Sequence, residues 1–354
     1  MIILFLLCFN SGILTGCREA IPKKLDVYIW EGYLPSEVAA LFEKETGIKL
    51  NINLISDNNK LAALLKGGGT ADIIMPTQSY IVRFYEAGLV QPLNLKSIKN
   101  YKYVSKSLRE QIWAKWDGSQ MGSGDIYAVP YIFGTNGLVI NTDKYSKNLD
   151  GIGWDVLFDK DLNERVSSKN GITSVLLILD LLGIPRGNLV TDTSGTLAEV
   201  RDKTIELKNN SLKFWSTGSE IIDLMKNEEV WVSEIQDGGG RELSQFNAKF
   251  KYVLPATGGL GWTDTFMIPK AAINKAGANM FIDFMLRPDI AAMVIDKSGF
   301  NTTVTDALDK TEIINRELYR ITDEQMTNLK WSPNWPEEVL SSFSSFWEEI
   351  SIVK

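Results

Sequence analysis

Aromatic and acidic residues gather at two places in the sequence, each beside glycines. Trp30 and Tyr33 lie in the segment Trp30-Glu-Gly-Tyr33, and Trp262 lies two residues before Asp264, just after a glycine-rich stretch. The face of a tryptophan ring attracts an ammonium group by roughly 0.5–2 kcal/mol, and an aspartate adds a charge-assisted hydrogen bond. Any one tryptophan is more often a core residue than a ligand platform. The pair of Trp262 and Asp264 nevertheless favours a binding site, because a buried aspartate needs a partner.

The residue types present exclude several kinds of catalytic and binding site. The 354-residue chain has no histidine, so Ser-His-Asp triads, Cys-His pairs, HExxH zinc sites and facial-triad iron sites are excluded. Its net charge of −7 argues against a nucleic-acid groove, which needs clustered Lys and Arg. The length corresponds to about two domains. We expect no catalytic residue, no metal site, no cofactor and no nucleic-acid partner.

Two other patterns have simpler explanations than chemistry. The glycine runs at 67–69 and 238–240 fit neither the P-loop nor the strand–GxGxxG–helix motif, and we expect turns and helix stops there. The adjacent acids Glu228-Glu229 and Glu348-Glu349 cannot face each other across a sugar as the two carboxyls of a glycosidase do. We expect both pairs to be solvated helix ends.

The N-terminus predicts secretion and lipid attachment. Residues 1–16 carry no charged side chain, and their apolar run is too short for a bilayer span, which needs about 20 residues. Leu14-Thr-Gly-Cys17 resembles the bacterial lipobox, which implies a lipoprotein signal peptide at 1–16 and acylation of Cys17. Residues 17–24 would then be a lipidated tether. The alternative is a buried first strand with a chance cysteine.

Strands and helices alternate through the first part of the sequence, which predicts a mainly parallel sheet with crossover connections. The expected strands lie at 25–30, 49–55 and 71–76, and the expected helices at 35–45, 59–65 and 80–87. In an open α/β sheet, ligands bind outside the C-terminal ends of strands. Both aromatic segments have the character of strand ends, so we expect them to line one site.

A second α/β unit begins near Asn136. Its expected strands or extended segments lie at 138–140, 230–235 and 252–256, and its helices at 174–182 and 220–226. A strand at 266–269 is expected to return to the first unit. Further helices are expected at 279–286 and 341–350, the latter with an apolar stripe that includes Phe346 and Trp347.

Several stretches in order resemble one protein family. The chain from about Leu25 to its C-terminus is similar to the spermidine/putrescine-binding proteins of polyamine ABC transporters. The matching stretches are Trp30-Glu-Gly-Tyr33, Ala71-Asp-Ile-Ile-Met-Pro-Thr77, Tyr127-Ala-Val-Pro-Tyr-Ile-Phe-Gly134, Trp262-Thr-Asp264, Phe284-Met-Leu-Arg-Pro-Asp-Ile-Ala291 and Ser298-Gly-Phe300. The resemblance implies an α/β, two-lobed type II periplasmic-binding-protein fold with a ligand cleft between the lobes. The implied lobes are 22–134 plus 260–305 and 135–259 plus 306–354.

The resemblance also assigns residues to the cleft. Trp30 and Tyr33 match the family's aromatic wall, and Trp262 and Asp264 match its stacking tryptophan and its ammonium-binding aspartate. Three further positions differ in residue type, namely Thr77 in place of a serine, Ser79 in place of a tyrosine, and Phe300 in place of a tyrosine.

On the second lobe the chain departs from the family pattern. Asn170 and Thr173 stand where the family has a pair of acids, and Gln236, next to Asp237, stands where it has a tryptophan. A ligand with several ammonium groups therefore meets fewer carboxylates, so its selectivity should change. Our hypothesis is a short diamine such as putrescine, with one end on Asp264 and the other on Glu31 or Asp237.

The implied function is that of the substrate-binding component of an ABC importer. Such a protein would capture putrescine or spermidine and deliver it to a membrane permease with its ATPase, as a monomer anchored through Cys17 at the periplasmic or cell-surface side of a bacterial membrane. The alternatives are a lipoprotein of the same fold for another cationic or polar solute, a sensor or adhesin, and a carboxylate glycosidase. The glycosidase lacks a matched acid pair.

Overall fold

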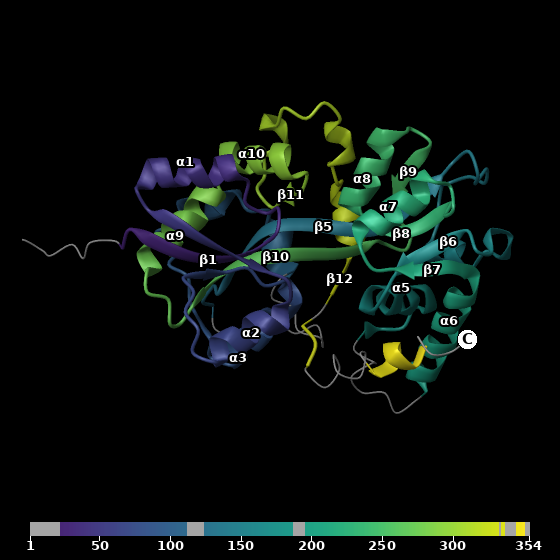
Figure 1. Cartoon of the computed structure of the whole chain (residues 1–354), viewed down its shortest axis with the longest axis horizontal. Coiled ribbons are helices and arrows are strands. Elements are labelled where there is room, and N and C mark those ends of the chain that lie inside the picture. The colour runs from purple at the N-terminus through teal and green to yellow at the C-terminus, as the bar shows by residue number, and fades with distance from the viewer. Residues whose placement is uncertain (1–21, 112–123, 187–194, 333, 337–344, 351–354) are drawn as a thin grey trace, which may run out of the picture.

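The computed structural model describes residues 22–111, 124–186, 195–332, 334–336 and 345–350. Residues 1–16 and Cys17 lie outside the described residues. Two lobes stand side by side, and long strands run between them (Figure 1). We call the lobe that holds β1 lobe 1 and the lobe that holds β6 lobe 2.

Lobe 1 begins with the alternation that the sequence predicts. In β1 every second side chain is buried, namely Leu25, Val27 and Ile29, and β1 pairs in parallel with β2 and β3. The helices and strands of this part are β1 (Lys24–Trp30), α1 (Ser36–Thr46), β2 (Lys49–Ile55), α2 (Asn58–Lys66), β3 (Ile73–Ile74), α3 (Ile81–Glu86), β4 (Val90–Gln91) and α4 (Lys106–Gln111). The strands predicted at 25–30 and 49–55 and the helices predicted at 35–45 and 59–65 are confirmed. Later in the chain, α9 (Lys275–Met285), α10 (Pro288–Ser298) and β11 (Asn301–Thr302) complete lobe 1.

Two long antiparallel strands, β5 (Ala128–Asn141) and β10 (Leu260–Pro269), connect the lobes. They form the centre of one sheet with the order β2-β1-β3-β10-β5-β8-β6-β7. Their register shifts between Asp264 and Thr265. The sheet is therefore mixed, and the prediction of a mainly parallel sheet is wrong at these two strands.

Glycines explain why the sequence pattern shows β5 as only a short strand. Gly134 and Gly137 interrupt its apolar residues and look like turn signals. In the structure a Cβ on Gly134 would lie 2.2 Å from Cζ2 of Trp262. The glycine therefore provides room for a large ring on the neighbouring strand.

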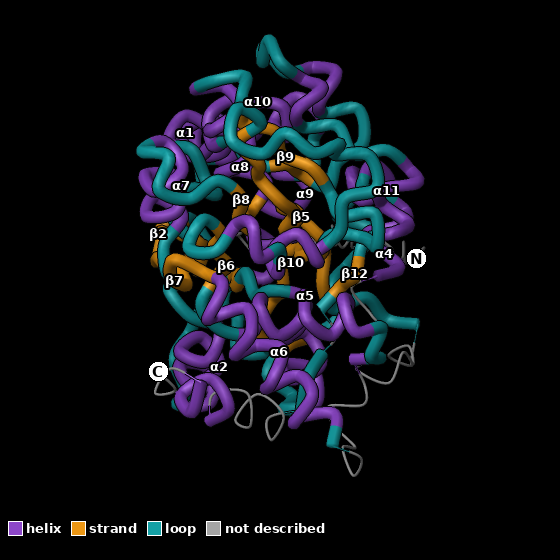
Figure 2. Tube along the Cα trace, turned by 90° about the vertical axis from the view of Figure 1, so that its right-hand side faces the viewer, coloured by secondary structure: helices purple, strands orange, loops and turns teal. Residues whose placement is uncertain are grey.

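Lobe 2 packs helices on both faces of its strands. Leu138 and Ile140 lie in one core with α5, whereas Val139 lies in another with α7 and α8, and Figure 2 shows the strands between these helices. The elements are β6 (Val166–Lys169), α5 (Ile172–Leu182), α6 (Thr196–Asn210), β7 (Ser211–Trp215), α7 (Gly218–Lys226), β8 (Val232–Gln236), α8 (Asp237–Phe246) and β9 (Phe250–Val253). The glycine run 238–240 forms the first turns of α8, so the expectation of a turn or helix stop is wrong there. A Cβ on Gly240 would lie 2.3 Å from the Tyr252 ring, which explains the small residue.

The C-terminal part of the chain contacts both lobes. Ala307 and Tyr319 are buried in the lobe 1 core, whereas Trp335, Phe346 and Trp347 pack on lobe 2. We therefore propose that lobe 1 extends to about residue 320, beyond the boundary at 305 that the sequence predicts. Two short elements follow, α11 (Asp323–Asn328) and β12 (Lys330–Trp331). Of the helix predicted at 341–350, residues 345–350 are helical and the rest lies outside the described residues.

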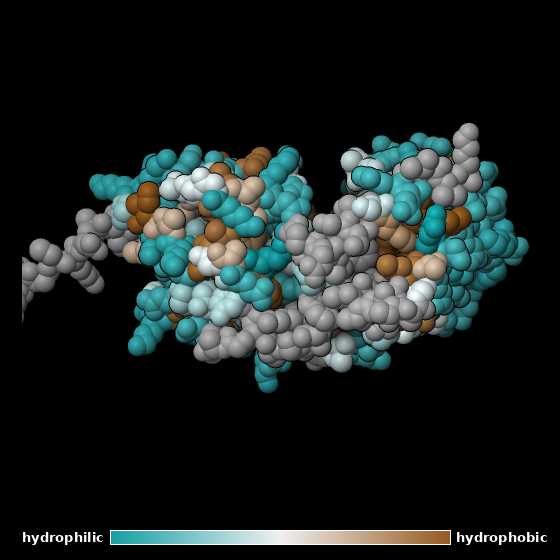
Figure 3. Space-filling view, turned by 90° about the horizontal axis from the view of Figure 1, so that it is seen from below, coloured by the Kyte–Doolittle hydropathy of each residue, from teal (hydrophilic) through white to brown (hydrophobic). Residues whose placement is uncertain are grey.

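The surface is polar over most of both lobes, and an indentation separates them along one edge when the molecule is seen from below (Figure 3). Within the described part of the chain, no helix combines the length and the apolar character that crossing a membrane requires.

Candidate ligand-binding site

A cavity of about 810 Å³ lies between the two lobes. It brings together ten of the twelve site residues that the sequence predicts, and they come from six separate parts of the chain. These ten are Trp30, Glu31, Tyr33, Thr77, Ser79, Thr173, Gln236, Trp262, Asp264 and Phe300.

Asp264 is the buried acid of this cavity. Its side chain is 4% exposed. The Tyr33 hydroxyl donates to Oδ2 at 2.7 Å, and the Thr77 hydroxyl donates to Oδ1 at 2.7 Å. Asn58 in turn donates from Nδ2 to the Thr77 hydroxyl at 3.1 Å, which fixes that hydroxyl. Each carboxylate oxygen therefore has one neutral donor, and among the described residues no cation forms an ion pair with Asp264.

Burial sets the protonation of this carboxyl. Loss of hydration raises the pKa of Asp264 from 3.8 to about 6, and the hydrogen bonds from Thr77 and Tyr33 act in the opposite direction. Burial and the neighbouring Asp264 likewise raise the pKa of the Tyr33 hydroxyl, so Tyr33 is neutral and can donate. The cavity therefore holds a carboxylate whose hydrogen-bond donors are neutral. A cationic ligand would stabilise the negative charge of this carboxylate.

Aromatic rings surround this acid. Trp262 and Asp264 lie on the same face of β10 because side chains alternate along a strand. The Tyr33 and Phe300 rings meet edge to face, with centroids 4.7 Å apart. Trp30 is the last residue of β1, so its expected position at a strand end is confirmed. Aromatic rings beside a buried acid are a combination suited to an ammonium group with an alkyl chain.

The expected strand end is wrong for Trp262 and Asp264, which lie inside β10. Because β10 runs antiparallel to β3, its early residues still reach the edge where the parallel strands end. Asp264 forms an isolated bridge with Thr77, just after β3. The two aromatic segments thus meet as predicted, although for a different topological reason.

Two predicted residues do not line this cavity. Asn170 is exposed after β6, and its neighbour Lys169 lines the cavity instead. Asp237 pairs with Arg241, with 2.7 Å between Oδ2 and the guanidinium, and both residues are 4% exposed. Asp237 faces an adjacent cavity of about 360 Å³ beyond Trp262. Its charge is already compensated, so the structure offers no free Asp237 carboxylate to a ligand.

Sequence patterns gave no sign of several lining residues, including Asn136 and Lys169. Asn136 is buried, and its Nδ2 donates to Oε1 of Glu234 at 2.6 Å. Burial raises the pKa of Glu234. Asp57, which also lines the cavity, caps α2, and its side chain accepts from the amides of Asn59 and Lys60. An aspartate just before a predicted helix is the signal that could have identified it. Asn136 carries no comparable signal, because only the register of β5 brings it to the cavity.

Residues 37–320, well over half of the chain, match the family described as bacterial extracellular solute-binding protein. The chain belongs to this family. It is therefore a solute-binding protein, and the family is one of binding and transport proteins.

Relatives of this solute-binding protein have named ligands. The putrescine-binding periplasmic protein of Escherichia coli is 27% identical over 310 residues, which cover 81% of each chain. The putrescine-binding periplasmic protein of Pseudomonas aeruginosa is 26% identical over 361 residues, which cover 96% of this chain and 95% of the relative. The spermidine/putrescine ABC transporter substrate-binding protein of Streptococcus pneumoniae matches in structure with a TM-score of 0.77 at 23% identity, covering 94% of this chain and 99% of that one. This likeness confirms the predicted two-lobed α/β fold.

Among the described residues, no three His, Cys, Asp or Glu side chains are placed to hold a metal ion.

Proposed function

We propose that this solute-binding protein is the substrate-binding component of an ABC importer and captures a polyamine, putrescine or spermidine, between its lobes. The observation that carries the proposal is Asp264, a buried carboxylate with neutral donors, surrounded by rings, in the interlobe cavity. The polyamine-binding relatives support the ligand class. One ammonium group would bind Asp264 while the alkyl chain lies against Trp30 and Trp262. Capture requires no proton transfer or bond cleavage, so we propose a binding protein and not an enzyme.

The second ammonium group needs another acceptor. Glu31 lines the cavity and is exposed, so its carboxylate can turn to a ligand at little cost. Asp237 is less suitable because it already binds Arg241. We therefore propose Glu31, on lobe 1, as the partner of the second amine of a diamine.

Calorimetry and tryptophan fluorescence test this function directly. Putrescine and spermidine are titrated separately into the protein, with butane-1,4-diol as an uncharged analogue of putrescine. We expect stoichiometric binding of at least one polyamine, a change in tryptophan emission, and no binding of the diol. If a folded protein gives neither heat nor a fluorescence change with either polyamine, the proposed ligand class is wrong.

Acid should weaken binding, because the ligand binds the ionised form of Asp264. Its pKa of about 6 in the free protein means that the carboxylate must lose a proton before binding at pH 5. We expect the affinity to be nearly constant above pH 7 and about tenfold lower at pH 5. Calorimetry from pH 5 to 8 measures this, and proton release on binding near pH 6 is the matching observation. An affinity that is unchanged or higher at pH 5 would contradict it.

We also propose that the chain is attached to a bacterial membrane through Cys17 and passes its ligand to a permease on the periplasmic or cell-surface side, acting as a monomer. Cells that express the full chain with an alkyne-labelled fatty acid should incorporate the label into the wild-type protein. The Cys17→Ala variant should take up no label and should leave the membrane fraction or keep residues 1–16. Label retained in Cys17→Ala would rule out this site of acylation.

A further inference from the structure

The interlobe cavity has opposite charges on its two sides. Of the described residues that line it, the acids Glu31, Asp57 and Asp264 all belong to lobe 1. The charged residue that lobe 2 contributes is a cation, Lys169. A polyamine that spans the cavity would therefore have one end beside the acids of lobe 1 and the other end beside Lys169 of lobe 2.

The structure holds Lys169 at this position. It is the last residue of β6, and its backbone amide donates to Oε2 of Glu234 at 2.8 Å. Its Nζ lies 5.5 Å from the ring centroid of Trp215. Within the described part of the chain no carboxylate forms an ion pair with Nζ, although the buried Glu234 interacts with it electrostatically.

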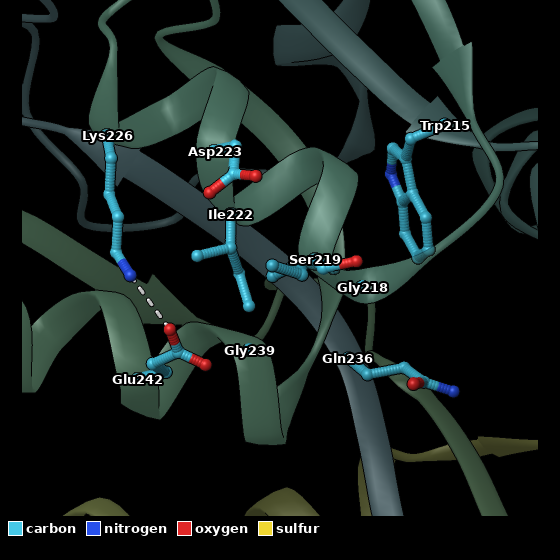
Figure 4. Close-up of a pocket in the computed structure, with 10 residues that line it drawn as sticks. Trp215, Gly218, Ser219, Ile222, Asp223, Lys226, Gln236, Gly239 and Glu242 are labelled. Atoms are coloured by element: carbon cyan, nitrogen blue, oxygen red, sulfur yellow. Dashed lines mark hydrogen bonds and ion pairs between the residues drawn. The ribbon is translucent and has the colours of Figure 1, made fainter.

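Trp215 also lines a smaller cavity of about 290 Å³ inside lobe 2, shown in Figure 4. Gln236 lies on the same side of this cavity as Trp215, and an ion pair of 2.9 Å between Lys226 and Glu242 lies on the other side. Glu242 binds Lys226, and among the described residues neither Glu242 nor Asp223, the other acid of this cavity, forms an ion pair with Lys169. The ammonium of Lys169 thus remains a positive charge beside the ligand cavity.

The strand register tells how far Asp264 is from the lobe 2 wall. Asp264 pairs with Ile132 of β5, and Gln236 pairs with Asn136 of the same strand, so their backbones are separated by about 13 Å along β5 at about 3.3 Å per residue. An extended alkylamine advances by about 1.25 Å per bond, which gives about 6 Å between the nitrogens of putrescine and about 11 Å between the ends of spermidine. With the first nitrogen about 3 Å from Asp264, the far nitrogen of putrescine lies about 9 Å from this carboxylate, short of the lobe 2 wall, whereas that of spermidine lies about 14 Å from it and reaches that wall.

We propose that Lys169 is a specificity-determining residue that selects against polyamines with a third ammonium group. This inference rests on the proposed function, because it presupposes that a polyamine binds with one end on Asp264. The Lys169 ammonium repels the far amine of spermidine and leaves the shorter diamine almost unaffected. Specificity then comes from a repulsive group on lobe 2, in addition to the attractive acids on lobe 1.

Charge variants at Lys169 test the proposal by calorimetry with putrescine and spermidine. For the wild type we expect putrescine to bind more tightly than spermidine by about tenfold or more. Lys169→Gln should improve spermidine affinity by about tenfold and change putrescine affinity by less than about threefold. Lys169→Glu should improve spermidine binding further, and Lys169→Met replaces the glutamine variant if that one does not fold.

Lys213→Gln is the matched control, because Lys213 is half exposed on β7 of the same lobe and pairs with Glu220 outside the cavity. It should change neither affinity. Polyamine binding with an unchanged ratio of the two affinities in Lys169→Gln would overturn the inference, and so would an equal gain for both ligands. Absence of polyamine binding in every variant and the wild type would instead overturn the proposed function.

Discussion

Replacement of Asp264 by asparagine is expected to abolish polyamine binding and at the same time to stabilise the unliganded protein. The ligand loses its buried counter-charge, and breaking such a pair costs on the order of 3–5 kcal/mol, so affinity should fall by at least about 100-fold. Calorimetry with putrescine and spermidine measures this loss.

The gain in stability follows from the raised pKa of Asp264. Its folded-state pKa of about 6 exceeds the ordinary value of 3.8, so ionisation is less favourable in the folded protein than in the unfolded chain. The resulting cost is absent below about pH 4, develops as the pH rises through 6, and reaches on the order of 3 kcal/mol at pH 7. Asparagine avoids the charge but offers one acceptor fewer to Tyr33 and Thr77, so we expect a net gain of about 1–3 kcal/mol.

Chemical unfolding of the unliganded protein at pH 7.5 and pH 4.5 checks both the sign and its origin. The advantage of Asp264→Asn should be clear at pH 7.5 and should shrink at pH 4.5, where the wild-type carboxyl is largely protonated. Asp143→Asn, at an exposed position, is the control for loss of one negative charge. A variant that is less stable than wild type at both pH values would show that the two hydrogen bonds outweigh the cost of burying the charge.

Removal of either partner of the Asp237–Arg241 pair is expected to destabilise the fold. Arg241 binds Asp237, donates to the Gly299 carbonyl at 3.0 Å, and lies 4.3 Å from the Tyr319 ring centroid. It therefore links α8 of lobe 2 to the end of α10 in lobe 1. Asp237→Ala or Arg241→Ala leaves one buried charge unpaired, which typically costs about 3–5 kcal/mol.

A double-mutant cycle separates this structural role from ligand binding. The double variant Asp237→Ala/Arg241→Ala should lose less stability than the two single variants together, because neither charge is left alone. Where the single variants remain folded, they should bind polyamine with affinity close to wild type. A stable Asp237→Ala protein that no longer binds polyamine would instead assign Asp237 to the ligand.

The local structure of lobe 1 could be predicted from the sequence because its strands alternate clearly and its helices have recognisable ends. The alternation in Leu25, Val27 and Ile29 identified β1, and α2 ends where the glycine run 67–69 begins, as expected of a helix stop. The long strands β5 and β10 could not be predicted in full. Their glycines, such as Gly134, are there because a ring from the adjacent strand needs the space, and that reason exists only in the folded protein.

The acidic and aromatic part of the site could be predicted for a related reason. Trp30, Trp262 and Asp264 are recognisable from residue type and from resemblance to a family, and they meet in one cavity. The ion pair between Asp237 and Arg241 could not be predicted from the sequence. Asp237 and Arg241 are four residues apart, a helical spacing, but the three intervening glycines concealed the helix. Lys169 was missed because its role depends on which strand end faces the cavity.

The position of Asp264 beside the register shift in β10 has a mechanical consequence. β5 and β10 connect the lobes, and we propose that the lobes rotate about these strands, from an open to a closed state, when the proposed ligand binds at Asp264. A ligand contact close to this rotation axis acts with a short lever arm. A small rotation about the axis nevertheless becomes a large displacement at the outer rim of each lobe. Binding to Asp264 alone therefore exerts little torque toward the closed state. On this proposal the torque comes from contacts farther out on lobe 2, and the groups on that wall determine which bound ligands close the protein.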